Sequence, residues 1–360
     1  MLSRNLQSFS HTNGVSCFYD SPLEVWYQIF ASWSDERQKE FLGIPGLPNQ
    51  SLLATIFYSF QRRLSWSHNP TADLGQGKTI LELLQRQVHQ AIFGIWKLYP
   101  RVQYGCAVTW MNKAITVSVC MIQQQVLFIY ASQDSIPHSV QAWFGIQHDV
   151  VYECSSGHTF QEPAEQPRHP FTPRIQDLRQ SARRTPDGSP LLSDVLSHLV
   201  PYRLTNKLPI HLQSSITCHN EECQDLSKVI SVTTHWPQIL QITLRPEGPD
   251  LQLEETLHIG GTVEYKLVGC VFFNRGGSHF FSHLFVGGQL YQYDDLVRGG
   301  KLQEFNGGVF DYDPTFIEIN ALFYNRVSVE GVRYFTLPLS KLLTHHIGHQ
   351  SGYHCNPLGF

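Results

Sequence analysis

The chain has 360 residues, of which 42% are hydrophobic and 16% are charged, so it can bury a large core in one multi-lobed unit or two domains. Its net charge of −4 and the lack of a basic run that would neutralise phosphates exclude nucleic acid as an expected partner. No run of eighteen apolar residues and no signal-peptide core are present, and the cysteines are irregularly spaced. We therefore expect no membrane partner and an intracellular protein, cytoplasmic or nuclear, with reduced thiols.

Both ends of the chain are predicted to lie outside a main domain at residues 43–343. Residues 1–42 form an N-terminal extension with one amphipathic segment, Pro22 to Trp33, which we expect to pack as a helix. Residues 344–360 form a flexible tail rich in histidine. The alternative for this tail is metal binding through its histidines and Cys355.

The segment from Gly43 to Ser51 leads into a predicted helix. Apolar residues from Leu52 to Phe60 recur at helical spacing, and Pro45 and Pro48 exclude a helix before them. Ser51 is therefore predicted at a helix N-terminus. The unpaired backbone N–H groups and the helix dipole favour negative charge there, which lowers the pKa of a thiol and stabilises an oxyanion.

This segment resembles the cysteine box of the ubiquitin-specific proteases, whose form is Gly-Leu-x-Asn-x-Gly-Asn-Thr-Cys followed by a helix. Gly43, Ile44 and Asn49 match it directly or conservatively, and the ungapped register puts Ser51 at the catalytic Cys. Gly46 stands where the family has the Asn whose side-chain amide binds the oxyanion. The resemblance therefore implies a site without its thiol and without one oxyanion donor. The residues of the implied oxyanion region are Gly46, Asn49 and Gln50.

A second match lies later in the chain. The strand that begins at Tyr265 and the loop before His279 resemble the histidine box of the same family. Tyr291 to Val297 resembles its Trp-Tyr-x-Phe-Asp-Asp-x-x-Val motif. The resemblance implies that His279 is the general base and that Asp294 is the carboxylate that orients it. The residues implied to line the groove for the tail of ubiquitin are Gly277, Ser278 and Phe280.

The spacing of this second match has a physical reason. A base on one strand can meet its carboxylate on the adjacent antiparallel strand when a short turn joins them, and Gly287-Gly288 is the predicted turn. His283 is the rival base, because strand alternation puts it on the same face as His279. The resemblance favours His279.

Two predicted hairpins carry cysteine and histidine at short spacing. Three residues separate Cys154 from His158, and four separate Cys218 from Cys223, which suits the knuckles that bind zinc. We expect a tetrahedral zinc site at the tips of the two hairpins, with His219 as a substitute for His158. The alternative is a degenerate finger without metal, whose cysteines are ordinary small hydrophobic residues.

Three further segments carry structural expectations. Gly75 to Thr79 lacks the spacing and the preceding strand of a phosphate-binding loop, so we expect a loop in which Thr79 caps a helix from Ile80 to Tyr99. Gln161 to Pro190 is predicted to be a flexible insertion, and Leu191 to Leu204 a helix.

Helices first and antiparallel strands later indicate an α+β fold. The resemblance implies a papain-like cysteine peptidase with the ubiquitin-specific-protease hand, with a thumb at residues 43–140, fingers at 141–235 and a palm at 236–343. It also implies a pseudo-deubiquitinase that binds ubiquitin or a ubiquitinated protein, within or outside a protein complex, without efficient hydrolysis. The alternatives are an active deubiquitinase whose nucleophile position carries Ser51, natively or by engineering, and a purely structural scaffold subunit.

Overall fold

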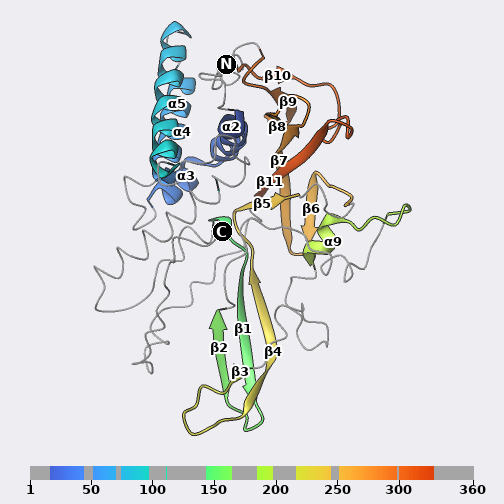
Figure 1. Ribbon diagram of the computed structural model, residues 1–360. Coiled ribbons are helices and arrows are strands. Elements are labelled where there is room, and N and C mark those ends of the chain that lie inside the picture. The colour runs from blue at the N-terminus through green and yellow to red at the C-terminus, as the bar shows by residue number, and fades with distance from the viewer. Residues whose placement is uncertain are drawn as a thin grey trace.

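The computed structural model describes residues 17–43, 52–69, 74–96, 111, 143–163, 185–197, 216–244, 251–297 and 300–327. Within these ranges most helices come first and two antiparallel sheets follow, so the fold is α+β as predicted (Figure 1). The helices are α2 (Cys17–Ala31), α3 (Asp35–Leu42), α4 (Leu52–His68), α5 (Leu74–Trp96) and α9 (Leu192–Ser197). No helix in the described part of the chain is long and apolar enough to cross a membrane.

Helix α2 is the central element of the helical layer. Large apolar residues recur along it, and Trp26, Ile29 and Phe30 are fully buried, as expected for a helix that is apolar on most of its circumference. It contacts α4 on one side and strands β7 and β8 on the other. Residues of α2 and α3 therefore pack into the main core together with α4 and the larger sheet. The sequence shows the helical pattern of this segment. It does not show how much of the surface of α2 is buried, because the strands β7 and β8 that cover it are distant in sequence.

The larger sheet has seven strands in the order β10-β9-β8-β7-β11-β5, with β6 paired to β7. All the pairings are antiparallel. One face packs against the helical layer, and the other covers a second apolar core that includes α9. The strands are β5 (Ile239–Thr243), β6 (Thr256–Ile259), β7 (Val263–Asn274), β8 (His279–Val286), β9 (Gln289–Tyr293), β10 (Gln303–Glu304) and β11 (Ile317–Arg326).

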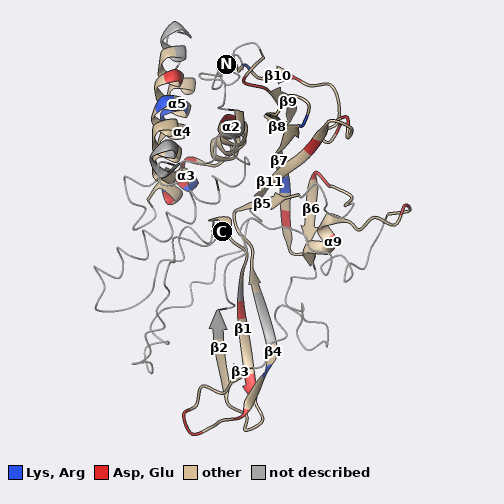
Figure 2. Ribbon diagram, viewed as in Figure 1, with Lys and Arg blue, Asp and Glu red and all other residues tan. Residues whose placement is uncertain are grey.

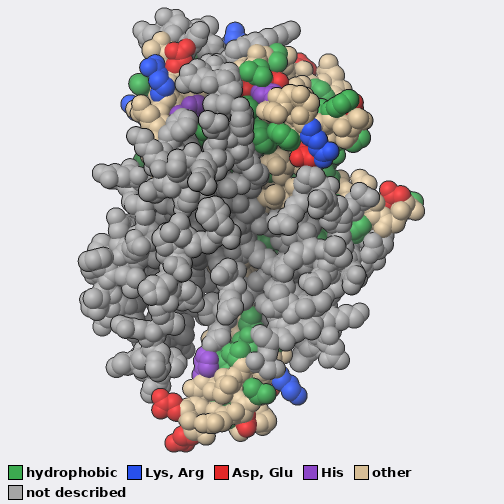
Figure 3. All heavy atoms as spheres, viewed as in Figure 1, with side chains coloured by type: hydrophobic (Ala, Val, Ile, Leu, Met, Phe, Trp, Pro, Cys, Tyr) green, Lys and Arg blue, Asp and Glu red, His purple; other side chains and the backbone are tan. Residues whose placement is uncertain are grey.

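The smaller sheet has four strands in the order β2-β1-β4-β3. Its strands β1 (Gln147–Cys154) and β4 (Leu226–His235) form a long antiparallel stem that extends away from the larger sheet (Figure 1). Strands β2 (Thr159–Pro163) and β3 (Ile216–Thr217) flank this stem. Acidic residues gather at its far tip (Figures 2 and 3), where Glu153, Glu221 and Glu222 are exposed and Asp225 is partly buried. Such a tip attracts cations rather than polyanions.

Two predicted segment boundaries differ from the structure. Helix α5 begins at Leu74, so Gly75 to Thr79 is helical and Thr79 does not cap a later start. Glycine lowers helix stability by only about 1 kcal/mol per residue, and tertiary packing can offset that amount. Strand β2 continues to Pro163, three residues into the predicted insertion. Helix α9 covers the first part of the predicted helix, and residues 198–204 lie outside the described ranges.

Candidate active site and candidate metal centre

Strands β8 and β9 bring His279 and Asp294 together. His279 opens β8, and Asp294 directly follows β9. The two strands are joined at Gly287 and Gly288, whose φ angles of 58° and 85° lie in the left-handed region that glycine tolerates best. His279 Nε2 lies 2.8 Å from Asp294 Oδ1. A histidine and a carboxylate are thus hydrogen-bonded on neighbouring strands.

The imidazole of His279 is held in its charged form. Burial by itself lowers the pKa of His279, but the hydrogen bond and charge of Asp294 and the neighbouring Cys17 raise it to about 10. Burial raises the pKa of Asp294, yet His279 and the backbone N–H groups of Leu296 and Val297 lower it overall. The pair is therefore an imidazolium and a carboxylate at neutral pH.

The rival base, His283, lies in a different environment. Its Nδ1 donates a hydrogen bond to the carbonyl of Val309 at 3.1 Å, and its ring contacts those of Phe272, Phe281 and Phe305. Burial lowers its pKa. His283 is thus a neutral histidine of the core.

Sequence reasoning missed Cys17. This residue opens α2, is 8% exposed, and is one of the neighbours that raise the pKa of His279. A thiol at a helix N-terminus next to an imidazolium is the environment that activates cysteine nucleophiles. A signal was present, because Gly14-Val15-Ser16-Cys17 fits the Gly-Asn-Thr-Cys end of the cysteine box at Gly and Cys, with Ser for Thr.

Four of the other predicted site residues lie outside the described part of the chain, namely Gly46, Asn49, Gln50 and Ser51. Helix α4 begins at Leu52, so the predicted helix start is observed.

The predicted groove residues differ in exposure. Gly277 and Ser278 are exposed in the turn between β7 and β8, where Asn274 Oδ1 accepts hydrogen bonds from the N–H groups of Gly276 and Gly277. Phe280 is 7% exposed and belongs to the main apolar core. The groove formed by these three residues stays a prediction.

Ser278 has an unusual backbone conformation. Its φ angle is 48°, and every other described residue with positive φ is a glycine. Such a conformation is strained for a residue with a β-carbon. The strain lies directly before His279.

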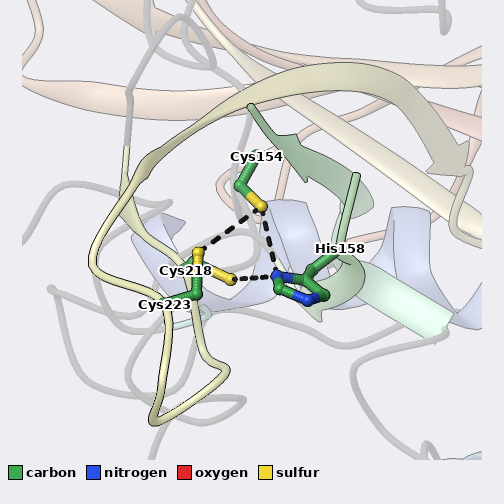
Figure 4. Close-up of side chains that lie close together, drawn as sticks. All are labelled: Cys154, His158, Cys218 and Cys223. Atoms are coloured by element: carbon green, nitrogen blue, oxygen red, sulfur yellow. Dashed lines mark hydrogen bonds between the residues drawn. The ribbon is translucent and has the colours of Figure 1, made fainter. Parts of the chain in front are cut away.

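The four predicted metal ligands meet at the tip of the smaller sheet. Cys154, His158, Cys218 and Cys223 each offer one ligand atom, and these atoms all lie within 4.8 Å of one another (Figure 4). Cys154 Sγ lies 3.5 Å from His158 Nδ1 and 3.8 Å from Cys223 Sγ, and Cys218 Sγ lies 3.7 Å from His158 Nδ1. Tetrahedral zinc with its usual bond lengths separates two sulfurs by about 3.8 Å and a sulfur from a nitrogen by about 3.6 Å. The donor set fits zinc.

Local turns hold these ligands in place. Gly157, with φ of 79°, donates its N–H to the Cys154 carbonyl, and Cys154 donates to the carbonyl of His158. On the other hairpin, the N–H of Cys223 binds the Asn220 carbonyl. Each knuckle is therefore a tight turn that presents two side chains to the same point.

The thiols of the cluster do not ionise independently. Burial raises the pKa of Cys154, but N–H groups of His158 and Ser156 and the neighbouring thiols lower it to about 7. The N–H of Asn220 lowers the pKa of Cys218, but burial and the neighbouring thiols raise it overall. A divalent cation would neutralise several thiolates at once.

His219, the predicted substitute ligand, stacks on Phe160 at a centroid distance of 4.2 Å. Phe160 in turn stacks on Tyr152. His158 is thus the histidine that faces the cysteines (Figure 4).

Comparison with known proteins gives similar structures only. No protein-family model matches the chain, and no curated protein matches it. The Ubp8-Sgf11-Sgf73-Sus1 SAGA DUB module is 11% identical, with 91% of this chain and 69% of that chain covered and a TM-score of 0.46. The module bound to monoubiquitin gives 11% identity, 91% and 71% coverage and a TM-score of 0.46. The Neurospora crassa Pan2 catalytic unit (protease and nuclease domain) is 12% identical, with 89% of this chain and 57% of that chain covered and a TM-score of 0.49. At these values the case for a function rests on the geometry of the site.

Proposed function

We propose that this protein is a cysteine-dependent hydrolase of the ubiquitin-specific-protease type. Cys17 would be the nucleophile, His279 the general base and acid, and Asp294 the carboxylate that orients the imidazole. The observation that carries the proposal is the position of His279, which is hydrogen-bonded to Asp294 and next to a thiol at a helix N-terminus. The histidine box and the Asp-Asp motif support ubiquitin as the substrate.

The geometry supports a mechanism in two steps. The imidazolium of His279 stabilises the thiolate of Cys17, which attacks the carbonyl carbon of the scissile bond. His279 then gives its proton to the leaving amine as the C–N bond breaks, and a thioester remains. In the second step His279 takes a proton from water, the hydroxide releases the carboxylic acid, and the thiol is regenerated. Backbone N–H groups in the first turn of α2 face the negative charge that develops on the oxygen.

Ser51 at the nucleophile position would indicate a pseudoprotease, because a hydroxyl is too basic to form an ion pair with an imidazolium. A nucleophilic Cys17 does not have this defect. With Cys17 in this role, Ser51 is not needed for catalysis.

A pseudo-deubiquitinase remains the second candidate, because one departure from the family persists. If the cysteine box ends at Cys17, Thr12 occupies the position of the oxyanion Asn. Loss of one oxyanion donor lowers the rate by about 10²–10³. Such a protein would bind ubiquitin and turn it over slowly.

The rest of the hand follows from the same proposal. The helical layer would be the thumb, the larger sheet the palm, and the smaller sheet the fingers that cradle ubiquitin. Cys154, His158, Cys218 and Cys223 would hold one structural zinc ion at the fingertips. The metal would stiffen a narrow stem that has little apolar core of its own.

The test uses turnover of ubiquitin with a carboxyl-terminal fluorogenic amide. We expect turnover by the parent protein, its loss in Cys17→Ala and its retention in Ser51→Ala. Calorimetry with monoubiquitin separates the remaining cases. Binding without turnover would indicate the pseudo-deubiquitinase, and absence of both would indicate a scaffold. Turnover that disappears in Ser51→Ala but not in Cys17→Ala would overturn the assignment of the nucleophile.

A further inference from the structure

A buried hydrogen bond connects the helix of Cys17 to the strand of His279. Ser21 Oγ donates to the carbonyl oxygen of Phe280 at 3.1 Å, across 259 positions of sequence. Ser21 is fully buried, and Phe280 is 7% exposed. Ser21 lies one helical turn after Cys17, and Phe280 directly follows His279. The bond therefore joins a residue one helical turn from Cys17 to the residue that directly follows His279.

The same side of α2 makes a second close contact with the sheet. Residues four apart lie on one face of a helix, so Cys17, Ser21 and Val25 form a line along α2. A β-carbon added at Gly269 of β7 would lie 3.2 Å from Val25 Cγ2 and only 2.7 Å from the carbonyl oxygen of His283. Gly269 thus allows α2 to pack closely against β7, because a side chain at this position would press on Val25.

The other strong polar links of α2 lead to helices. Asp20 accepts hydrogen bonds from His89 Nε2 and Gln85 Nε2 of α5, each at 3.0 Å. Glu24 forms a buried bidentate ion pair with Arg63 of α4. These links fix α2 within the helical layer, whereas the Ser21 bond fixes it relative to β8.

We propose that Ser21 is a positioning residue that sets the separation of Cys17 and His279. The inference rests on the proposed role of Cys17 as nucleophile. Without the hydroxyl, α2 loses a buried polar link to β8 one helical turn from the reacting thiol, and the thiol moves relative to the imidazole. A displacement of about 1 Å can lower the rate by about 10²-fold. The contact between the thiol and the imidazole weakens as well, so the thiol loses part of the activation that the neighbouring imidazolium gives it.

The experiment compares Ser21→Ala with a matched variant, Ser59→Ala. Ser59 is also buried and also hydrogen-bonds a backbone carbonyl, but within α4. We expect Ser21→Ala to lower kcat by about 10- to 100-fold with KM within about twofold, and to slow alkylation of Cys17 by iodoacetamide most strongly below pH 7. Ser59→Ala should leave kcat and the alkylation profile within about twofold of the parent. Ser21→Thr keeps the hydroxyl and should restore most of the rate.

The outcomes distinguish this inference from the proposed function. If turnover requires Cys17 but Ser21→Ala behaves like Ser59→Ala, the positioning role is wrong and the proposed function stands. If the parent shows neither turnover nor alkylation of Cys17 below pH 7, both are wrong. Alanine is the best helix former, so we expect the variant to fold. If Ser21→Ala does not fold, Ser21→Cys replaces it, because a thiol is only a weak hydrogen-bond donor. A kcat of Ser21→Cys equal to that of the parent would contradict the inference.

Discussion

His279 presents Nε2 to Asp294, whose Oδ1 lies 2.8 Å away, and this leaves Nδ1 as the ring nitrogen available to Cys17. The carboxylate therefore fixes the ring orientation and stabilises the imidazolium.

The first prediction concerns the orienting carboxylate. Asp294→Asn keeps the size of the side chain but removes the charge that raises the pKa of His279. We expect kcat for the ubiquitin amide to fall by roughly 10²–10⁴, with an unchanged affinity for monoubiquitin. Asp313→Asn, an exposed carboxylate outside the site, is the control. Equal kcat values for the two variants would rule out this role for Asp294.

The second prediction is a pH dependence of stability. The pKa of His279 rises from 6.5 to about 10 on folding, so between these pH values the folded chain holds a proton that the unfolded chain has lost. The free energy of unfolding therefore decreases as pH rises through this range, and the contribution of His279 is complete below pH 6.5. His279→Gln should lack that contribution. Urea unfolding of both proteins at intervals from pH 6 to 10 measures the difference, and parallel curves would contradict the raised pKa.

The third prediction concerns zinc. Protein purified without chelators should contain about one equivalent of zinc, and His158→Ala should lose it. The neighbouring His219 stacks on Phe160, so His219→Ala should keep the metal. Cys218→Ala should also release zinc, whereas Cys270→Ala, at a buried thiol in β7, should not. Metal analysis that finds no zinc in the parent would show that the four residues are an unfilled remnant.

The fourth prediction concerns the ion pair that fixes α2 to α4. Glu24 and Arg63 are 0% and 2% exposed, and the guanidinium lies 3.6 Å from the centroid of the Tyr27 ring. Arg63→Met leaves a buried carboxylate without its partner, which should lower the free energy of unfolding by about 3–5 kcal/mol. The exposed neighbour Arg62 provides the control, since Arg62→Met should change it by less than about 0.5 kcal/mol. Urea denaturation gives both values.

Local signals predicted which side chains lie close together in the cysteine-histidine cluster and in the His279–Asp294 pair. In each case a short turn, such as Cys154 to His158 or Gly287-Gly288, determines which side chains face the same point, and turn residues are visible in sequence. The two knuckles lie next to each other because β1 pairs with β4, which places Cys154 opposite Ser227.

The partner of His279 could not be identified in the same way. Both α2 and α4 begin with the favourable electrostatics of a helix N-terminus, and both are preceded by a partial match to the cysteine box, so the sequence offers two candidates for the helix that faces β8. That choice depends on contacts such as Ser21 with Phe280, which join residues 259 positions apart. The start of α5 at Leu74 has a similar cause, because packing overrides the weak helix preference of glycine.

The role of Cys17 as nucleophile is tested most directly by identifying the residue that reacts with a ubiquitin probe carrying a carboxyl-terminal electrophile. The parent protein is incubated with the probe and digested, and the modified peptide is identified by mass spectrometry. We expect a single adduct on Cys17 that is absent in Cys17→Ala and unaffected by Ser51→Ala. Capture at Ser51 or at another cysteine, or no capture by a protein that binds monoubiquitin, would contradict this role.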